Sequence, residues 1–529
     1  MTTAMEPPMK ITLAHHIFLS IVRAGFLFLV FIMRPIYFLL YEKETQLTKP
    51  SSPLLMKSAT ELADLIRKQV VTSSDVVKAY IEQIRAVNPI LNAMVCHRFD
   101  KALVEAAEVD KLLQSGNIPD DWSPEKAPFL GVPITIKEAF ALEGMPQSSG
   151  LLCRRLFFAK EDAEVVANLK KAGVIPLCVT NTSELCMWYE SSNLVYGRTN
   201  NAYHHGRIVG GSSGGEACII SAAGSVIGIG SDIGGSIRMP ANFNGIFGHK
   251  PTTGVVSNKG QHPIATNDAS TFLCTGPMCR YAVDLIPMLK IMAGSGCRKM
   301  RLDNEVDVKQ LKYYYMENDG GSYLSCPVDC QVEKRVRKAA EHFKSIGATV
   351  TKVNIQQLKH SLEIWITKMN TSGNESFCFL MGNSVKPVNP FVELQYWLLG
   401  CPRHTLPAIT LGIAEKIRSS SDVEAALIKA CEQLKDVFGE LLKDDGVFLY
   451  PSHPVPAPYH HQPIFMWFNF AYTAIFNVLG LPVTQVPMGI GKERVPIGIQ
   501  VVAGRHNDHL TLAVAKHMET VFGGWISPF

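Results

Sequence analysis

Three segments of the chain carry residues that could build a serine-based catalytic site. The runs Gly-Gly-Ser-Ser-Gly-Gly-Glu at residues 210–216 and Asp-Ile-Gly-Gly-Ser-Ile-Arg at 232–238 each hold serine among glycines, and Lys137 ends the mostly apolar run 131–136. A serine hydroxyl becomes a nucleophile only when a base removes its proton and donors stabilise the developing anion. Glycine-rich backbone supplies unobstructed N–H donors, and a lysine buried without a counter-ion loses its charge more readily. The segments therefore indicate nucleophilic catalysis that needs no histidine.

Taken together, the three segments resemble the amidase signature family, and the separation of Ser212 from Ser236 agrees with the family pattern. The resemblance extends from about residue 57 to near the C-terminus. It implies a Ser-Ser-Lys triad in which Ser236 attacks the substrate carbonyl, Ser212 relays its proton and Lys137 is the base. The same relay, run in reverse, would protonate the leaving nitrogen.

The resemblance also assigns supporting roles around this triad. The backbone amides expected to hold the tetrahedral oxyanion are those of Ile233, Gly234, Gly235 and Ser236. Asp232 and Arg238 flank this loop and are expected to orient it. Cys186, with its neighbours Leu185 and Met187, is expected to line the acyl pocket beside the triad, and Ser212 is expected to contribute to the substrate-binding site as well.

Other interpretations of the glycine-rich runs leave residues without a role. Residues 210–214 also satisfy the Gly-x-Ser-x-Gly elbow of α/β-hydrolases, with Asp445 and His453 as downstream partners, but then Lys137 and Ser236 do nothing. The run lacks the Gly-Lys-Ser/Thr ending of a nucleotide P-loop. Residues 228–234 miss the dinucleotide spacing by one position, and Pro240 interrupts the helix that this motif requires.

Composition narrows the class of protein. The chain has 529 residues and a net charge of +4, and it carries no basic stripe with interleaved aromatics, so we expect no nucleic-acid partner. Its 13 cysteines follow no disulfide or zinc spacing. We expect no metal and no cofactor.

The N-terminal segment is predicted to be a membrane element. Residues 11–40 are overwhelmingly apolar, and a helix of this length exceeds the roughly 30 Å hydrocarbon core, so a tilted anchor fits. A cleaved signal peptide and an in-plane or hairpin insertion bent at Pro35 remain alternatives. The predicted organisation is an anchor over residues 1–45 and one catalytic domain over 46–529.

Within the catalytic domain, helical and apolar extended segments alternate. Residues 58–61 have capping-box spacing, a helix from Ser73 or Ser74 should end before Pro89, and residues 132–136, 174–180 and 226–229 are predicted strands. Residues 447–451, 476–482 and 496–500 resemble the C-terminal strands of the family. This rhythm predicts an α/β fold, and the resemblance implies the amidase-signature form of it: a large mixed, twisted sheet covered by helices on both faces.

The motifs do not name the substrate. Within the family the chain is similar to the fatty-acid amide hydrolases, which implies hydrolysis of N-acylethanolamines and primary fatty amides to fatty acid and amine. The implied partners are a lipid amide, the bilayer and a second copy in a homodimer, with a location at the endoplasmic reticulum or lipid droplets. Residues 391–413 would form either an apolar cap or a buried helix pair. A general small-amide amidase, an amidotransferase subunit and a non-catalytic lipid-binding relative are the alternatives.

Overall fold

The computed structural model describes residues 13–42, 47–116, 118–417 and 420–529. Within these residues one mixed sheet of 11 strands has the order β1-β3-β2-β6-β8-β7-β12-β13-β11-β9-β10. Its strands are β1 (Met94–His97), β2 (Pro133–Lys137), β3 (Ile175–Thr180), β6 (Ile227–Asp232), β7 (Phe247–Lys250), β8 (Cys274–Cys279), β9 (Lys312–Tyr315), β10 (Thr349–Lys352), β11 (Gly446–Pro451), β12 (Val483–Ile490) and β13 (Pro496–Ala503). A small ribbon joins β4 (Ser192–Asn193) to β5 (Gly197–Arg198).

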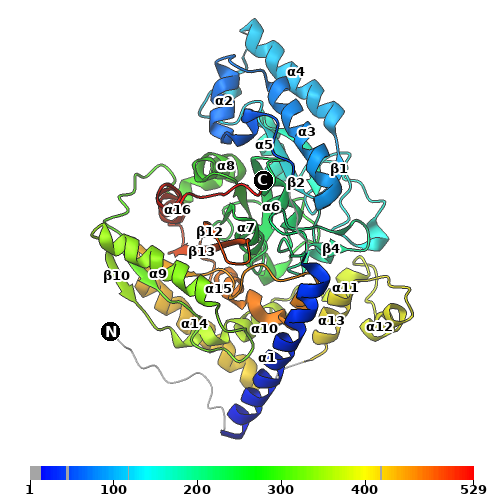
Figure 1. Ribbon diagram of the computed structural model, residues 1–529, viewed down its shortest axis with the longest axis vertical. Coiled ribbons are helices and arrows are strands. Elements are labelled where there is room, and N and C mark those ends of the chain that lie inside the picture. The colour runs from blue at the N-terminus through cyan, green and yellow to red at the C-terminus, as the bar shows by residue number, and fades with distance from the viewer. Residues whose placement is uncertain (1–12, 43–46, 117, 418–419) are drawn as a thin grey trace.

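Helices surround this sheet, with α2 to α4 at one end of the molecule and α1, α12 and α13 toward the other (Figure 1). They are α1 (Leu13–Tyr41), α2 (Ala59–Arg67), α3 (Ser73–Leu91), α4 (Phe99–Ser115), α5 (Glu164–Lys171), α6 (Gly214–Ser221), α7 (Arg238–Asn244), α8 (Leu285–Ala293), α9 (Cys330–Ser345), α10 (Ser361–Asn370), α11 (Phe377–Met381), α12 (Pro390–Leu398), α13 (Leu406–Ala414), α14 (Ser421–Leu442), α15 (Ala471–Val478) and α16 (Asp508–Phe522).

Strand β11 shows that both faces of the sheet are covered. Successive side chains of a strand point to opposite faces. Val447 and Leu449 lie in a hydrophobic cluster with side chains of α9 and α16, whereas Phe448 and Tyr450 lie in a second cluster with side chains of α14 and α15. Parallel and antiparallel pairs are both present, since β2 is parallel to β3 and β6 is antiparallel to β8. The predicted α/β fold with helices on both faces is confirmed.

One predicted helix end and one predicted strand are wrong. Helix α3 continues through Pro89 to Leu91. Pro89 lies in the last turn, and there the Asn88 side chain accepts hydrogen bonds from the amides of Ala93 and Met94 and stabilises the helix end.

The second error concerns residues 476–482, which are not a strand. They contain the end of α15 and a turn at Gly480 (φ +68°). The apolar residues of this run resemble those of a buried strand. However, Thr473 and Asn477, one helical turn apart, both donate hydrogen bonds to residues of the loop that carries Ser236. The helix is therefore held by side-chain contacts that the hydrophobic pattern does not reveal.

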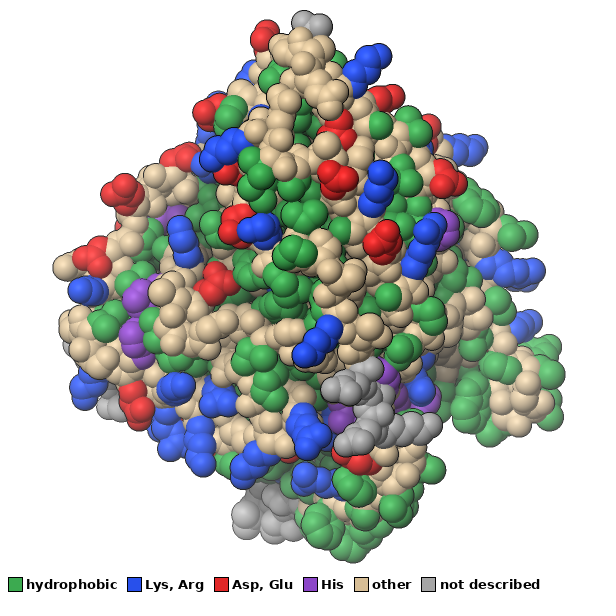
Figure 2. All heavy atoms as spheres, turned by 45° about the horizontal axis from the view of Figure 1, so that its top comes forward, with side chains coloured by type: hydrophobic (Ala, Val, Ile, Leu, Met, Phe, Trp, Pro, Cys, Tyr) green, Lys and Arg blue, Asp and Glu red, His purple; other side chains and the backbone are tan. Residues whose placement is uncertain are grey.

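Helix α1 is the described element that is long and apolar enough to cross a membrane. The span Arg23–Tyr41 has a mean hydropathy of 1.9 and is largely exposed, and Figure 2 shows hydrophobic side chains gathered over the lower end of the molecule. At its C-terminal end Tyr37 packs on Phe465, and Glu42 accepts a 2.7 Å hydrogen bond from the hydroxyl of Tyr459. Residues 1–12 and the predicted boundary between residues 45 and 46 lie outside the described residues.

Candidate active site

Lys137 is the last residue of β2, between β3 and β6, and its side chain is fully buried. Its Nζ donates a 2.7 Å hydrogen bond to Oγ of Ser212 and a 2.9 Å hydrogen bond to Oγ of Ser231. The predicted base therefore meets the predicted relay serine. It also meets Ser231, which sequence analysis missed. A polar residue near the carboxyl end of the buried strand β6 is the signal that could have found it.

Burial lowers the pKa of Lys137, because an ammonium group that is removed from water loses its hydration. Cys186, Asp232 and Glu216 oppose this shift. Asp232 acts weakly as a counter-ion to the lysine because it is itself paired with Arg238 at 2.9 Å. Burial thus shifts Lys137 toward its uncharged form, the form that the predicted base needs.

Ser212 lies in a tight loop that leads into α6. The peptide bond between Gly211 and Ser212 is cis. A Cβ at Gly211 would lie 2.4 Å from the carbonyl oxygen of Trp188, so a side chain does not fit there. The Ser212 carbonyl accepts hydrogen bonds from the hydroxyls of Thr182 at 2.9 Å and Ser191 at 3.3 Å. These contacts hold Ser212 against the lysine.

Ser236 lies in the turn between β6 and α7. Its exposed fraction of 9% exceeds the 1% of Ser212 and the 0% of Lys137, so it is the most exposed of the three predicted catalytic residues. The amide of Ser213 donates to the Ser236 carbonyl at 3.2 Å and joins the two serine loops. Within the described residues no hydrogen bond joins the hydroxyls of Ser212 and Ser236.

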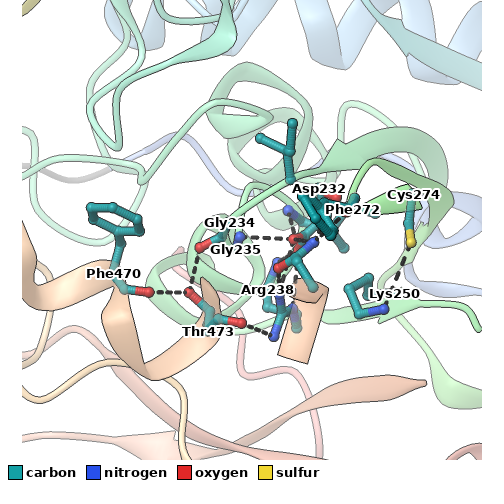
Figure 3. Close-up of polar contacts among 12 residues, drawn as sticks. Asp232, Gly234, Gly235, Arg238, Lys250, Phe272, Cys274, Phe470 and Thr473 are labelled. Atoms are coloured by element: carbon teal, nitrogen blue, oxygen red, sulfur yellow. Dashed lines mark hydrogen bonds and ion pairs between the residues drawn. The ribbon is translucent and has the colours of Figure 1, made fainter. Parts of the chain in front are cut away.

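The ion pair of Asp232 and Arg238 shapes the loop that carries Ser236 (Figure 3). Both side chains are fully buried, and the pair is bidentate, with Nε at 3.0 Å and Nη2 at 2.9 Å from the carboxylate. The carboxylate also accepts the amides of Gly235 at 2.7 Å and Ile237 at 3.0 Å. Burial would raise the pKa of Asp232, but Arg238, Lys250 and the Ile237 amide hold it well below its usual range. Asp232 and Arg238 thus orient the loop.

The amide of Gly235 does not have the predicted role of an oxyanion donor. This amide faces Asp232 and is therefore not free to bind an oxyanion. The amides of Ile233, Gly234 and Ser236 have no acceptor among the described residues. The carbonyls of Ile233 and Gly234 are held from the other side, by the indole of Trp365 at 3.0 Å and the hydroxyl of Thr473 at 2.7 Å.

Cys186 lies beside Lys137 in a short 3-10 turn, Glu184–Cys186. Its backbone φ is +58°, and its Sγ is 3.4 Å from Oγ1 of Thr182. Glu184, which sequence analysis also missed, is buried and accepts hydrogen bonds at 2.7 Å from His404 Nδ1 and from the amide of Thr405. These bonds tie the turn with Cys186 to the segment that leads into α13.

A buried lysine held by serine hydroxyls beside a glycine-rich turn, on a mixed sheet covered on both faces, is consistent with the class of amidases. The profile of the family described as Amidase matches residues 75–512. The chain belongs to the amidase signature family and is an amidase.

Individual proteins of known name resemble the chain over most of its length. The chain is 53% identical to fatty-acid amide hydrolase 2 of Homo sapiens, over 90% of this chain and 91% of that protein. It is also 53% identical to fatty-acid amide hydrolase 2-A of Danio rerio, with the same coverage. A solved structure titled fatty acid amide hydrolase superposes with a TM-score of 0.72 at 22% identity, covering 91% of this chain and 88% of the other, and shows the shared fold.

Proposed function

We propose that this chain is a membrane-anchored serine hydrolase that cleaves long-chain fatty-acid amides through Ser236, Ser212 and Lys137. The observation that carries the proposal is the buried amine of Lys137, 2.7 Å from the hydroxyl of Ser212. Burial lowers the pKa of this lysine, which favours the uncharged amine that can accept a proton. Ser212 lies in the loop that is joined to Ser236 through the Ser213 amide.

In the first half-reaction, Oγ of Ser236 attacks the amide carbonyl carbon and a C–O bond forms. The proton of Ser236 passes to Oγ of Ser212, whose own proton passes to Nζ of Lys137. The carbonyl oxygen takes the negative charge, and the unoccupied amides of Ile233, Gly234 and Ser236 stabilise it, a contribution of about 3 kcal/mol for each donor in other hydrolases.

The tetrahedral intermediate then collapses and the C–N bond breaks. An amine anion is a poor leaving group, so the nitrogen takes a proton from Ser212 as Lys137 returns its proton to Ser212. The products of this step are a free amine and an acyl-enzyme ester on Ser236. Water, deprotonated by the same relay, attacks the ester, releases the fatty acid and restores the Ser236 hydroxyl.

Two observations support a long acyl chain as substrate. The relatives with 53% identity are named for fatty-acid amides. Next to the proposed oxyanion loop, Trp365 and Phe470 pack edge to face with ring centroids 5.0 Å apart, and atoms of both rings lie within 3.7 Å of a Cβ built on Gly234. An aromatic wall of this kind suits the methylenes that follow the acyl carbonyl.

The purified enzyme tests this substrate class when oleamide, an N-acylethanolamine and acetamide are compared side by side. We expect kcat/KM for both long-chain amides to exceed that for acetamide by orders of magnitude, because each methylene that is buried contributes about 0.8 kcal/mol. Comparable values for acetamide would instead identify a general small-amide amidase.

We propose that α1 anchors the enzyme, because an enzyme that acts on lipid amides gains from a fixed position at the bilayer. Deletion of residues 1–36 removes most of the apolar span but keeps the contacts of Tyr37 and Glu42 with the catalytic domain. The shortened protein should appear in the soluble fraction after cell lysis and should still hydrolyse a soluble ester. Retention in the membrane pellet would assign attachment to another surface, such as the C-terminal end of α12, where Leu398 and the following Leu399 are exposed.

Location and assembly complete the proposal. A fluorescent fusion of the full chain is expected at the endoplasmic reticulum or lipid droplets, and a plasma-membrane signal would contradict this location. A homodimer is suggested only by the family resemblance. Light scattering of the protein in detergent would give twice the chain mass for a dimer, whereas the mass of one chain would remove this part of the proposal.

A further inference from the structure

Glu216 is a buried carboxyl group next to the triad that the proposed reaction does not use. It lies in the first turn of α6, four positions after Ser212, and is fully buried. Its Oε1 accepts a hydrogen bond from the Thr135 hydroxyl, and its Oε2 accepts one from the Thr180 hydroxyl at 2.6 Å. The two threonines come from the neighbouring strands β2 and β3, so the carboxyl group sits over the sheet.

The sheet makes room for this carboxyl group beside Lys137. Thr135 and Lys137 alternate along β2 and therefore share one face, and Thr180 is the register partner of Lys137. Thr135 is the register partner of Gly228 on β6. A Cβ at Gly228 would lie 1.7 Å from Oε1 of Glu216, so only glycine leaves space at this position.

The charges around Glu216 leave Lys137 as its cationic neighbour. Among the described residues no lysine, arginine or histidine forms an ion pair with Glu216, and Arg238 is committed to Asp232. The titratable groups that face the pair are the thiol of Cys178 from β3, the thiol of Cys186 and the carboxylate of Asp232.

Burial is the largest cause of the pKa shift of both Glu216 and Lys137. It raises the pKa of Glu216 to about 8, although the two threonine hydroxyls and Lys137 oppose the shift. It lowers the pKa of Lys137, and the charge of Glu216 opposes that shift. Because Glu216 and Lys137 lie over the same strands and their charges attract, the ionisation of one favours the charged form of the other.

We propose that Glu216 is a positioning residue for the general base: Glu216 and Lys137 hold one proton between them, and the carboxyl group decides how often Lys137 is free to accept another. The inference rests on the proposed function of Lys137. With the proton on Glu216, both groups are uncharged and the amine can deprotonate Ser212. With the proton on Lys137, the pair is a carboxylate and an ammonium ion, and the base is occupied.

The pH dependence of Glu216→Gln tests the inference. Glutamine keeps the shape of the side chain but cannot carry a negative charge, so the ammonium form of Lys137 loses its stabilising partner and its pKa falls. The enzyme needs the uncharged amine. In a series of increasing pH, the activity of the variant should therefore rise at a lower pH than the activity of the unmodified enzyme. We expect the acid limb of kcat/KM for oleamide to move to lower pH by about one unit or more.

Glu138→Gln is the matched control. Glu138 is adjacent to Lys137 in sequence and is equally buried, but it accepts its hydrogen bonds from the Ser148 and Ser149 segment and from Tyr196. We expect its acid limb to coincide with that of the unmodified enzyme. Coinciding limbs for Glu216→Gln, in a protein with an unchanged melting temperature, would overturn the inference.

Thr180→Val covers the case in which Glu216→Gln does not fold. Valine has the shape of threonine but donates no hydrogen bond, so the ionised form of Glu216 loses one donor and the acid limb should move in the same direction by a smaller amount. An unmoved limb in this folded variant also overturns the inference. The proposed function fails separately, if the unmodified enzyme shows no hydrolysis through Ser236 at any pH.

Discussion

Ser236→Ala is expected to abolish amide hydrolysis and labelling by a fluorophosphonate probe. The probe reacts with an activated serine oxygen, and alanine removes the atom that forms the acyl-enzyme bond. Loss of the nucleophile costs about a million-fold in kcat in a well-studied serine hydrolase, and we expect a loss of this order here. Stopped assays with oleamide and gel detection of the bound probe measure the two effects.

Ser213→Ala is the control for this variant. Ser213 is buried in the same region, but its hydroxyl faces the backbone of Ser231 at 3.4 Å, and its amide, which joins the two loops, is unchanged by the substitution. It should keep labelling and most activity. Labelling that persists in Ser236→Ala and disappears in Ser212→Ala would make Ser212 the nucleophile, as in the elbow arrangement.

The sequence was sufficient to predict the parts of the site that depend on residue type and short spacing. The lysine at the end of β2 and the serine of the first glycine-rich run are indeed in contact. Lys137 ends the buried strand β2, and Ser212 lies directly before α6, so the ends of two elements fix where these side chains project. The α/β fold followed from the alternation of helical and apolar segments for the same reason.

The parts that sequence could not predict depend on the partners of individual backbone groups. The glycines of residues 233–236 look equivalent as letters, but Asp232 takes the amide of Gly235 and leaves its neighbours unoccupied. Which amide a carboxylate accepts depends on φ and ψ, and Gly235 adopts φ +125°, a value that other residues rarely reach.

Buried carboxyl groups were missed for a different reason. Glu184 and Glu216 read as ordinary acidic residues, and most acidic residues are exposed. Their burial is compensated by threonine hydroxyls, a histidine and a backbone amide that come from segments 36 to 221 positions away. These hydrogen bonds form only in the folded chain, so no local sequence pattern predicts that the two carboxyl groups are buried.

Lys137→Met is expected to lower amide hydrolysis far more than ester hydrolysis. Methionine keeps the length of the side chain in a fully buried position but removes the group that receives and returns the proton. Both substrates lose the base, whereas only the amide also needs a proton on its leaving nitrogen, because an alkoxide departs more readily. General acid–base groups contribute about a hundred- to ten-thousand-fold, so we expect the ratio of amide to ester kcat/KM to fall by at least the lower figure.

Lys250→Met provides a matched comparison, because Lys250 is the other fully buried lysine among the described residues. Its Nζ donates to the Pro251 carbonyl at 3.0 Å and contacts Sγ of Cys274 at 3.6 Å, and Figure 3 places it apart from Gly234 and Gly235, on the far side of Asp232. The substitution should leave the ratio of amide to ester activity unchanged even if it lowers stability. Equal losses on amide and ester in Lys137→Met would show that the lysine supplies no proton to the leaving group, and the acid would then have to be sought elsewhere in the site.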